Sequence, residues 1–110
     1  MAYACVQDIA SSWQHYQLYA TEYVDPRPAG LIVHAAGPTD EGVRIIEIWH
    51  SEHDRLRFQT ERLIPAIAVL DGPPGPPPVL RDVHPAHLVI GTLDNQHSHT
   101  ATTPLTDTQS

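Results

Sequence analysis

The chain has 110 residues, enough for one domain with a single modest core. Six arginines and no lysine stand against thirteen acidic residues, for a formal net charge of −7, which argues against nucleic acid and anionic membranes as partners because both require a basic face. No apolar run approaches the roughly 20 residues of a membrane span. The lone Cys5 cannot form an intramolecular disulfide, and nothing at the N-terminus resembles a signal peptide. We therefore predict a cytoplasmic protein.

The first part of the chain predicts a strand followed by a helix. Residues 2–9, AYACVQDI, contain few polar positions and are typical of a short buried strand. Ser11 or Ser12 can then cap a helix that runs to about Val24. The apolar stripe of this helix has helical spacing and consists of Trp13, Tyr16, Ala20 and Tyr23. These side chains are candidates for the core, and Tyr16 or Tyr23 could alternatively line a ligand cavity.

Residues 30–50, GLIVHAAGPTDEGVRIIEIWH, predict a β-hairpin, because two runs rich in Val and Ile flank a segment of turn-forming residues. If Gly37 faces Gly42 across the turn, His34 lies opposite Ile45 and diagonal to Glu47. One face of the hairpin is then nearly uniformly apolar, with Leu31, Val33, Ala35, Ile46 and Ile48. The other face carries Ile32, His34, Ala36, Val43, Ile45, Glu47 and Trp49. A slip of one residue would separate His34 from Glu47, and the sequence leaves that alternative open.

The sequence after Trp49 predicts a second helix. Ser51 is placed to be its N-cap, with Asp54 at the reciprocal capping position. Leu56, Leu63, Ile67 and Leu70 trace the expected buried face, which Phe58 and Ile64 broaden. Pro65 removes a backbone hydrogen bond, so we expect a kink or break over residues 61–64.

The remaining sequence predicts a connection, an edge strand and a tail. Residues 72–78 are rich in proline and glycine and predict a stiff connection. Residues 79–90 read as a strand interrupted at Pro85, which restricts it to the margin of a sheet. Residues 1–91 thus form a single predicted domain. Residues 92–110 are rich in Thr and Ser, and we predict a disordered tail.

The order strand, helix, strand, strand, helix, strand predicts a ferredoxin-like βαββαβ fold of the α+β class, with both helices on one face of an antiparallel sheet. The hairpin has a nearly uniform apolar face that such a fold leaves uncovered. A homodimer in which two sheets meet face to face would bury it with one self-complementary surface.

These elements resemble a known family, the antibiotic-biosynthesis monooxygenases of the dimeric α+β barrel superfamily. The resemblance covers about residues 3–90 and rests on the element order, on the hairpin end EIWHS and on ERLIPAI at residues 61–67. It implies a cofactor-independent monooxygenase, working without flavin or metal on a small aromatic or polyketide-like molecule. It also implies that Trp49 lines the pocket.

The chemistry of such an enzyme requires a base in an otherwise apolar pocket. His34 has a suitable ordinary pKa, and Glu47 could orient its ring and stabilise its charged form, so we predict His34, Glu47 and Trp49 as catalytic residues. The predicted substrate-binding residues are Tyr16, Ile32, Ile45, Phe58 and His84. A His and a Glu on an apolar strand face can also simply pair at a dimer interface, and that alternative stays open.

Three other functions stay open. The same residues could serve a polyketide cyclase, in which the base enolises the substrate. The chain could instead be a non-catalytic dimeric module that binds a small ligand. A metal site is the third alternative, because His50 and His53, like His84 and His87, stand three residues apart, with His97 and His99 in the tail. No carboxylate or Cys at a suitable spacing completes that set, so we predict no metal.

Overall fold

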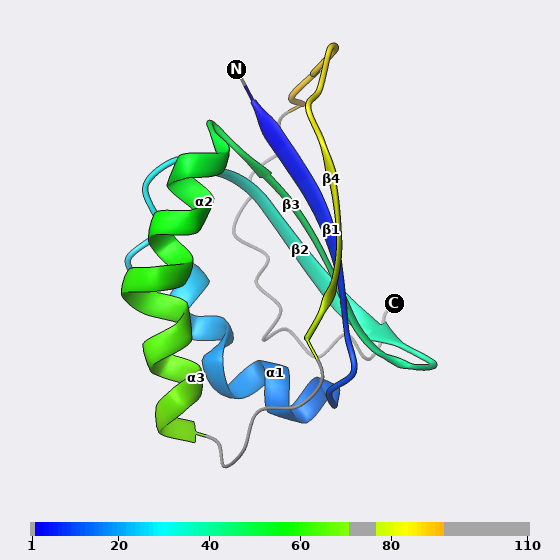
Figure 1. Cartoon of the computed structure of the whole chain (residues 1–110), viewed down its shortest axis with the longest axis vertical. Coiled ribbons are helices and arrows are strands. Elements are labelled where there is room, and N and C mark those ends of the chain that lie inside the picture. Colours follow the sequence, from blue (N-terminus) through cyan, green and yellow to red (C-terminus); the bar gives the residue numbers. More distant parts are fainter. Residues whose placement is uncertain (1, 71–76, 92–110) are drawn as a thin grey trace.

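The computed structural model describes residues 2–70 and 77–91 as one sheet covered by helices on one face (Figure 1). The strands have the order β2-β3-β1-β4, and each neighbouring pair is antiparallel. In chain order the elements are β1 (Tyr3–Ile9), α1 (Trp13–Tyr19), the 3-10 turn η1 (Ala20–Tyr23), β2 (Leu31–Thr39), β3 (Gly42–Trp49), α2 (Glu52–Phe58), the π-helical turn η2 (Gln59–Leu63), α3 (Ile64–Leu70) and β4 (Val79–Val83). This arrangement confirms the predicted ferredoxin-like α+β fold.

The core lies between the sheet and the helices. Successive side chains of a strand point to opposite faces, so β1 directs Tyr3, Cys5 and Gln7 toward the helices. The buried apolar residues that form this core are Tyr3, Cys5, Tyr16, Tyr19, Tyr23, Val43, Ile45, Trp49, Phe58 and Leu63. Aromatic side chains make up most of its large members, and they come from both the sheet and the helices.

The hairpin exists as predicted, but its register differs by two residues. The strands continue to Thr39 and Gly42, so the turn contains only Asp40 and Glu41. Gly42 has a φ of +149°, and an added Cβ would meet the backbone carbonyl of Ile9, so glycine is required at this tight turn. His34 therefore pairs directly with Glu47 and not with Ile45. Because the shift is an even number of residues, His34 and Glu47 still share a face.

An irregularity at the start of β2 changes the face of one residue. The register shifts between Leu31, which pairs with Trp49, and Val33, which pairs with Ile48. Such a bulge reverses the alternation of side chains. Leu31 consequently packs against the core, and its predicted place on the apolar outer face is wrong. Val33, Ala35, Ile46 and Ile48 remain on that outer face, which the helices leave uncovered.

The helix after β3 starts as predicted and then departs from regular geometry. The Ser51 side chain accepts a hydrogen bond from the backbone N–H of Asp54, which confirms the N-cap. The expected break before Pro65 takes the form of the π turn η2. This turn places Phe58 and Leu63, five residues apart, on the buried side. The predicted burial is wrong for Leu56, Ile64 and Leu70, which are exposed, because it assumed an uninterrupted 3.6-residue period.

The C-terminal strand lies at the margin of the sheet, as predicted from Pro85. β4 pairs only with β1 and forms one edge of the sheet, and it ends two residues before Pro85, as expected for an edge strand. Residues 72–76 of the predicted connection (72–78) and the predicted tail (residues 92–110) lie outside the described residues. Within the described ranges, none of the helices has the length and apolar character needed to cross a membrane.

Candidate active site

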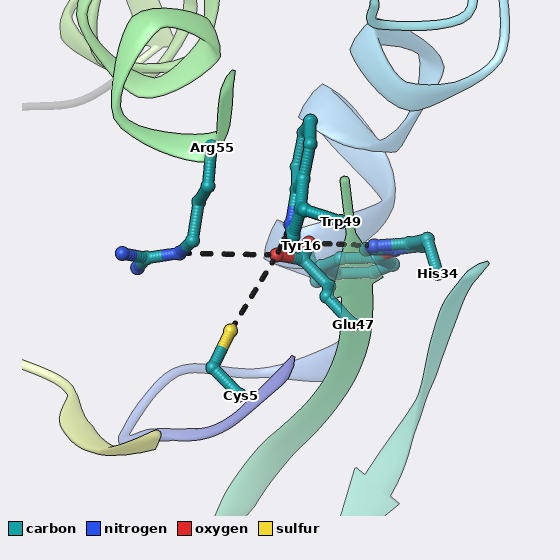
Figure 2. A network of polar contacts seen from close by, with 6 residues as sticks. All are labelled: Cys5, Tyr16, His34, Glu47, Trp49 and Arg55. Carbon is teal, nitrogen blue, oxygen red and sulfur yellow. Dashed lines mark hydrogen bonds and ion pairs between the residues drawn. The ribbon is translucent and has the colours of Figure 1, made fainter. Parts of the chain in front are cut away.

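A histidine and a carboxylate face each other at the centre of the helix-covered side of the sheet (Figure 2). His34 on β2 and Glu47 on β3 are directly paired, and the distance from Nδ1 of His34 to Oε2 of Glu47 is 2.8 Å. The side chain of Glu47 is 1% exposed and that of His34 is 12% exposed. The carboxylate is therefore enclosed by protein, whereas the imidazole keeps a small contact with solvent.

The other ring nitrogen of His34 contacts a tyrosine of the first helix. Nε2 lies 2.6 Å from the hydroxyl oxygen of Tyr16, which is buried. A carboxylate can only accept, so Nδ1 carries the proton and donates a hydrogen bond to Glu47. Nε2 is then the basic nitrogen, and it accepts a hydrogen bond from the Tyr16 hydroxyl. The resulting chain runs from phenol to imidazole to carboxylate.

The second oxygen of Glu47 contacts three further side chains. Nε1 of Trp49 donates a hydrogen bond to Oε1 over 3.0 Å. Sγ of Cys5 lies 3.9 Å from the same oxygen, and Nε of Arg55 lies 4.0 Å from it. Glu47 thus connects β1, β2, β3 and α2 in one polar network inside an otherwise apolar core (Figure 2).

Aromatic rings fix the imidazole in place. Tyr23 stacks on His34 with ring centroids 3.7 Å apart, and its ring also packs against Phe58. Tyr23 belongs to the short turn η1, which Arg62 holds from the opposite helix by hydrogen bonds to the backbone oxygens of Glu22 and Pro26. Arg62 therefore positions the ring that lies on His34, without itself touching the imidazole.

Burial keeps both tyrosines of the site neutral. It raises the pKa of Tyr16, and the nearby Tyr19 and Glu47 act in the same direction. Burial also raises the pKa of Tyr23 well above its ordinary value, with the Glu47 charge as the next cause. Both phenols consequently stay protonated at neutral pH, and Tyr16 can donate a hydrogen bond to the unprotonated Nε2 of His34.

The structure gathers several of the residues predicted to bind substrate around this network. Tyr16 contacts His34, and Phe58 lies against Trp49 with ring centroids 5.7 Å apart. Ile45 is buried on the same face of β3 as Glu47. His84 lies farther out, against Tyr3, with ring centroids 5.6 Å apart. Ile32 is half-buried at the irregularity of β2, outside the core cluster.

The histidine pairs considered as metal ligands do not converge. His50, His53, His84 and His87 all lie within residues 2–70 and 77–91, where no three His, Cys, Asp or Glu side chains are grouped in a way that could hold a metal ion. His97 and His99 lie outside the described residues. The polar network at Glu47 is therefore the candidate site of the described part of the chain.

Sequence reasoning missed one charged member of the site. Arg55 is buried, although arginine is seldom buried unless it is paired. It precedes Phe58 by three residues, which places both on one face of α2. Choosing Phe58 in place of Leu56 as the reference for the buried face would have placed Arg55 toward the core.

Cys5 is expected to be inert toward thiol reagents in the folded protein. Burial, followed by the charge of Glu47, raises the pKa of this thiol to about 11, so the thiolate is scarce at neutral pH. We expect a thiol-reactive disulfide reagent to label Cys5 at least about a hundredfold more slowly in the native chain than in urea. Mass spectrometry of timed samples measures both rates. Equal rates would contradict the enclosed environment of Glu47.

Comparisons with known proteins bear on the fold. No protein-family model matches the chain, and the comparison with curated proteins gave no significant match. The structure is similar to a crystal structure of a monooxygenase from the gene ActVA-Orf6 of Streptomyces coelicolor in complex with the ligand nanaomycin D, with a TM-score of 0.50 and 17% sequence identity. The match covers 83% of this chain and 92% of that chain. This likeness shows that the chain shares the fold of that monooxygenase.

Proposed function

We propose that this protein is a small tailoring enzyme, a cofactor-independent monooxygenase that acts on an aromatic or polyketide-like molecule. The observation that carries the proposal is the chain from Tyr16 through His34 to Glu47, in which a basic ring nitrogen is held among aromatic side chains. The monooxygenase with the similar fold, whose crystal structure holds the ligand nanaomycin D, supports the substrate class.

The network can remove a proton from an electron-rich substrate. A phenolic or enolic proton passes to the Tyr16 oxygen while the Tyr16 proton moves to Nε2 of His34, and Glu47 stabilises the resulting imidazolium. The ring of Tyr16 stacks on that of Trp13 with centroids 5.0 Å apart, which helps to hold the phenol against His34. The substrate anion then gives one electron to molecular oxygen. In the complete reaction an anthrone methylene and O₂ become a quinone carbonyl and water, so the substrate itself supplies the electrons.

The proposal includes a homodimer in which the uncovered faces of two sheets meet. This face carries Val33, Ala35, Ile46 and Ile48 from the hairpin together with Val79 and Val83 from β4. Ile46, near its centre, is 46% exposed in the single chain. Asp8, Arg44 and Arg81 lie on the same face, so it carries charged as well as apolar residues. An exposed apolar cluster with polar residues around it is typical of an interface between subunits.

A charge at the centre of this face is expected to abolish the dimer. Ile46→Glu would place a carboxylate in the contact between the two sheets, and burying an unpaired charge costs several kcal/mol, roughly. Light scattering after gel filtration should give a dimer for the wild type and a monomer for Ile46→Glu. Leu18→Glu, an equal change on the outer side of α1, should leave the dimer intact. A wild-type monomer would contradict the proposed assembly.

The reaction itself is tested by oxygen uptake. Purified protein is mixed with an anthrone in a sealed oxygen-electrode cell, and the product is analysed by mass spectrometry. We expect uptake of one O₂ per substrate, and a product in which two hydrogens are replaced by one oxygen. A product of unchanged mass with a closed ring would favour the polyketide cyclase. Tight binding without turnover would favour a non-catalytic module and contradict the enzymatic proposal.

A further inference from the structure

Three buried hydrogen-bond donors on one side of Glu47 have no partner among the described residues. They are the hydroxyl of Tyr3, Nε2 of Gln7 and Nε of Arg55. Buried polar groups in native proteins are nearly always paired, so each such atom requires an explanation. A ligand that supplies acceptor atoms would satisfy donors of this kind.

These donors lie on the β1 side of the network, away from His34. Cys5 of β1 pairs directly with Glu47, and Tyr3 pairs directly with Trp49, so both project onto the helix-covered face beside the site. Arg55 reaches over Glu47 from α2, and Figure 2 shows its terminal nitrogens directed away from the carboxylate. The guanidinium and the imidazole therefore lie on opposite sides of Glu47.

Arg55 is more than a counter-ion of Glu47. Its side chain is 7% exposed, yet its Nε stays 4.0 Å from the nearest carboxylate oxygen, which exceeds hydrogen-bonding distance. The oxygen that it approaches already accepts from Trp49. Nε of Arg55 is buried and has no hydrogen-bond partner within residues 2–70 and 77–91. A planar fork of this type is suited to bind a carboxylate through two parallel hydrogen bonds.

The electrostatic effect of Arg55 on Tyr3 supports placing these two donors near each other. Burial raises the pKa of Tyr3, and the Arg55 charge is the chief influence that lowers it again. The negative charges of Glu52 and of the exposed Asp82 raise the pKa of Tyr3 further. An acidic ligand would therefore be held by oriented donors at short range and not by a broad positive field.

We propose that Arg55 and Tyr3 form a subsite for an acidic group, so that the preferred substrate is an aromatic molecule bearing a carboxylate. This inference rests on the proposed function, because it names the substrate class of the same site. It assigns the two sides of the network different tasks. The His34 side removes the proton, and the Arg55 side holds the acidic end of the ligand.

The test compares three probes that share one ring system: 2-naphthol, 6-hydroxy-2-naphthoic acid and its methyl ester. Their affinities for the full chain are measured by calorimetry at about pH 7, where a carboxylic acid is ionised. Because hydrogen bonds to charged groups are the strong ones, we expect the acid to bind about tenfold or more tighter than the ester. Arg55→Gln should bring this ratio close to one. Arg57→Gln is the matched control, since Arg57 lies on the same helix and pairs with Asp54 at the surface.

Each outcome decides the inference. Equal affinity for acid and ester, or an undiminished ratio in Arg55→Gln, would overturn it and leave the aromatic site intact. Failure of all three probes to bind would contradict the proposed function as well. If circular dichroism shows that Arg55→Gln does not fold, Tyr3→Phe replaces it, because this change removes one donor and alters no charge. Tyr3→Phe should lower the ratio several-fold, and an unchanged ratio in that variant would count against the subsite.

Discussion

Glu47→Ala is expected to destabilise the fold by about 3–5 kcal/mol, because it removes one partner from a buried charged network. His34 and Trp49 would lose the acceptor of their hydrogen bonds, and the charge of Arg55 would lose its nearest opposite charge. Glu47→Gln keeps the volume and one acceptor oxygen, so its loss should be smaller. Urea unfolding followed by circular dichroism measures both changes in the free energy of unfolding.

The matched control for this experiment is Arg57→Gln. Arg57 also belongs to an ion pair, since its Nη2 lies 2.7 Å from Oδ1 of Asp54, but its side chain is 41% exposed on α2, away from the open face of the sheet. Exposed ion pairs contribute little to stability, so this variant should unfold close to the wild-type midpoint. An alanine variant of Glu47 that loses less than about 1 kcal/mol would show that the network is solvated and not enclosed.

His34→Gln is expected to lower the rate of oxygen uptake by about 10²–10⁴-fold, the contribution typical of a positioned general base. Glutamine fills a similar space and can still contact Glu47, but it cannot accept a proton at neutral pH. Oxygen-electrode rates at several substrate concentrations separate kcat from KM, and the loss should appear in kcat. His53→Gln, at an exposed position on α2, should leave the rate unchanged.

Tyr16→Phe examines the route of the proton in the same assay. In the proposed relay the phenol oxygen receives the substrate proton, so its removal should slow kcat nearly as much as His34→Gln. If Tyr16→Phe is as fast as the wild type while His34→Gln is slow, the substrate reaches Nε2 directly. Full activity in both variants would contradict the proposed catalytic roles of the two residues.

The residues that form the candidate site were partly evident from the sequence because strand pairing is a local property. Alternation along the hairpin places His34, Glu47 and Trp49 on one face in every register that differs by an even number of residues. The shared face is therefore unchanged, although β2 continues two residues farther into the turn than predicted, so that Thr39 and not Gly37 lies opposite Gly42. Ser51 was equally evident, since a cap depends only on its own first helical turn.

Arg55 could not be placed in this way because its orientation depends on the phase of a whole helix. The π turn inserts an extra residue into the helical repeat, so the face defined by Leu56, Leu63, Ile67 and Leu70 is not continuous. Leu56 lies at the surface, and Arg55 and Phe58 turn inward in its place. Periodicity identifies a helix well but fixes its buried face poorly where the period itself changes.

By itself the sequence determined the order of the elements and the hairpin, since both follow from residues near one another in the chain. It predicted a shared face for His34 and Glu47, but only the structure excluded the one-residue slip that would have separated them. Only the tertiary structure decided that Tyr16 meets Nε2, that Tyr23 lies on the imidazole and that Arg55 approaches Glu47. Those contacts join helices to strands that are distant in sequence. They depend on how two curved layers pack against each other, and no local pattern of residues encodes that packing.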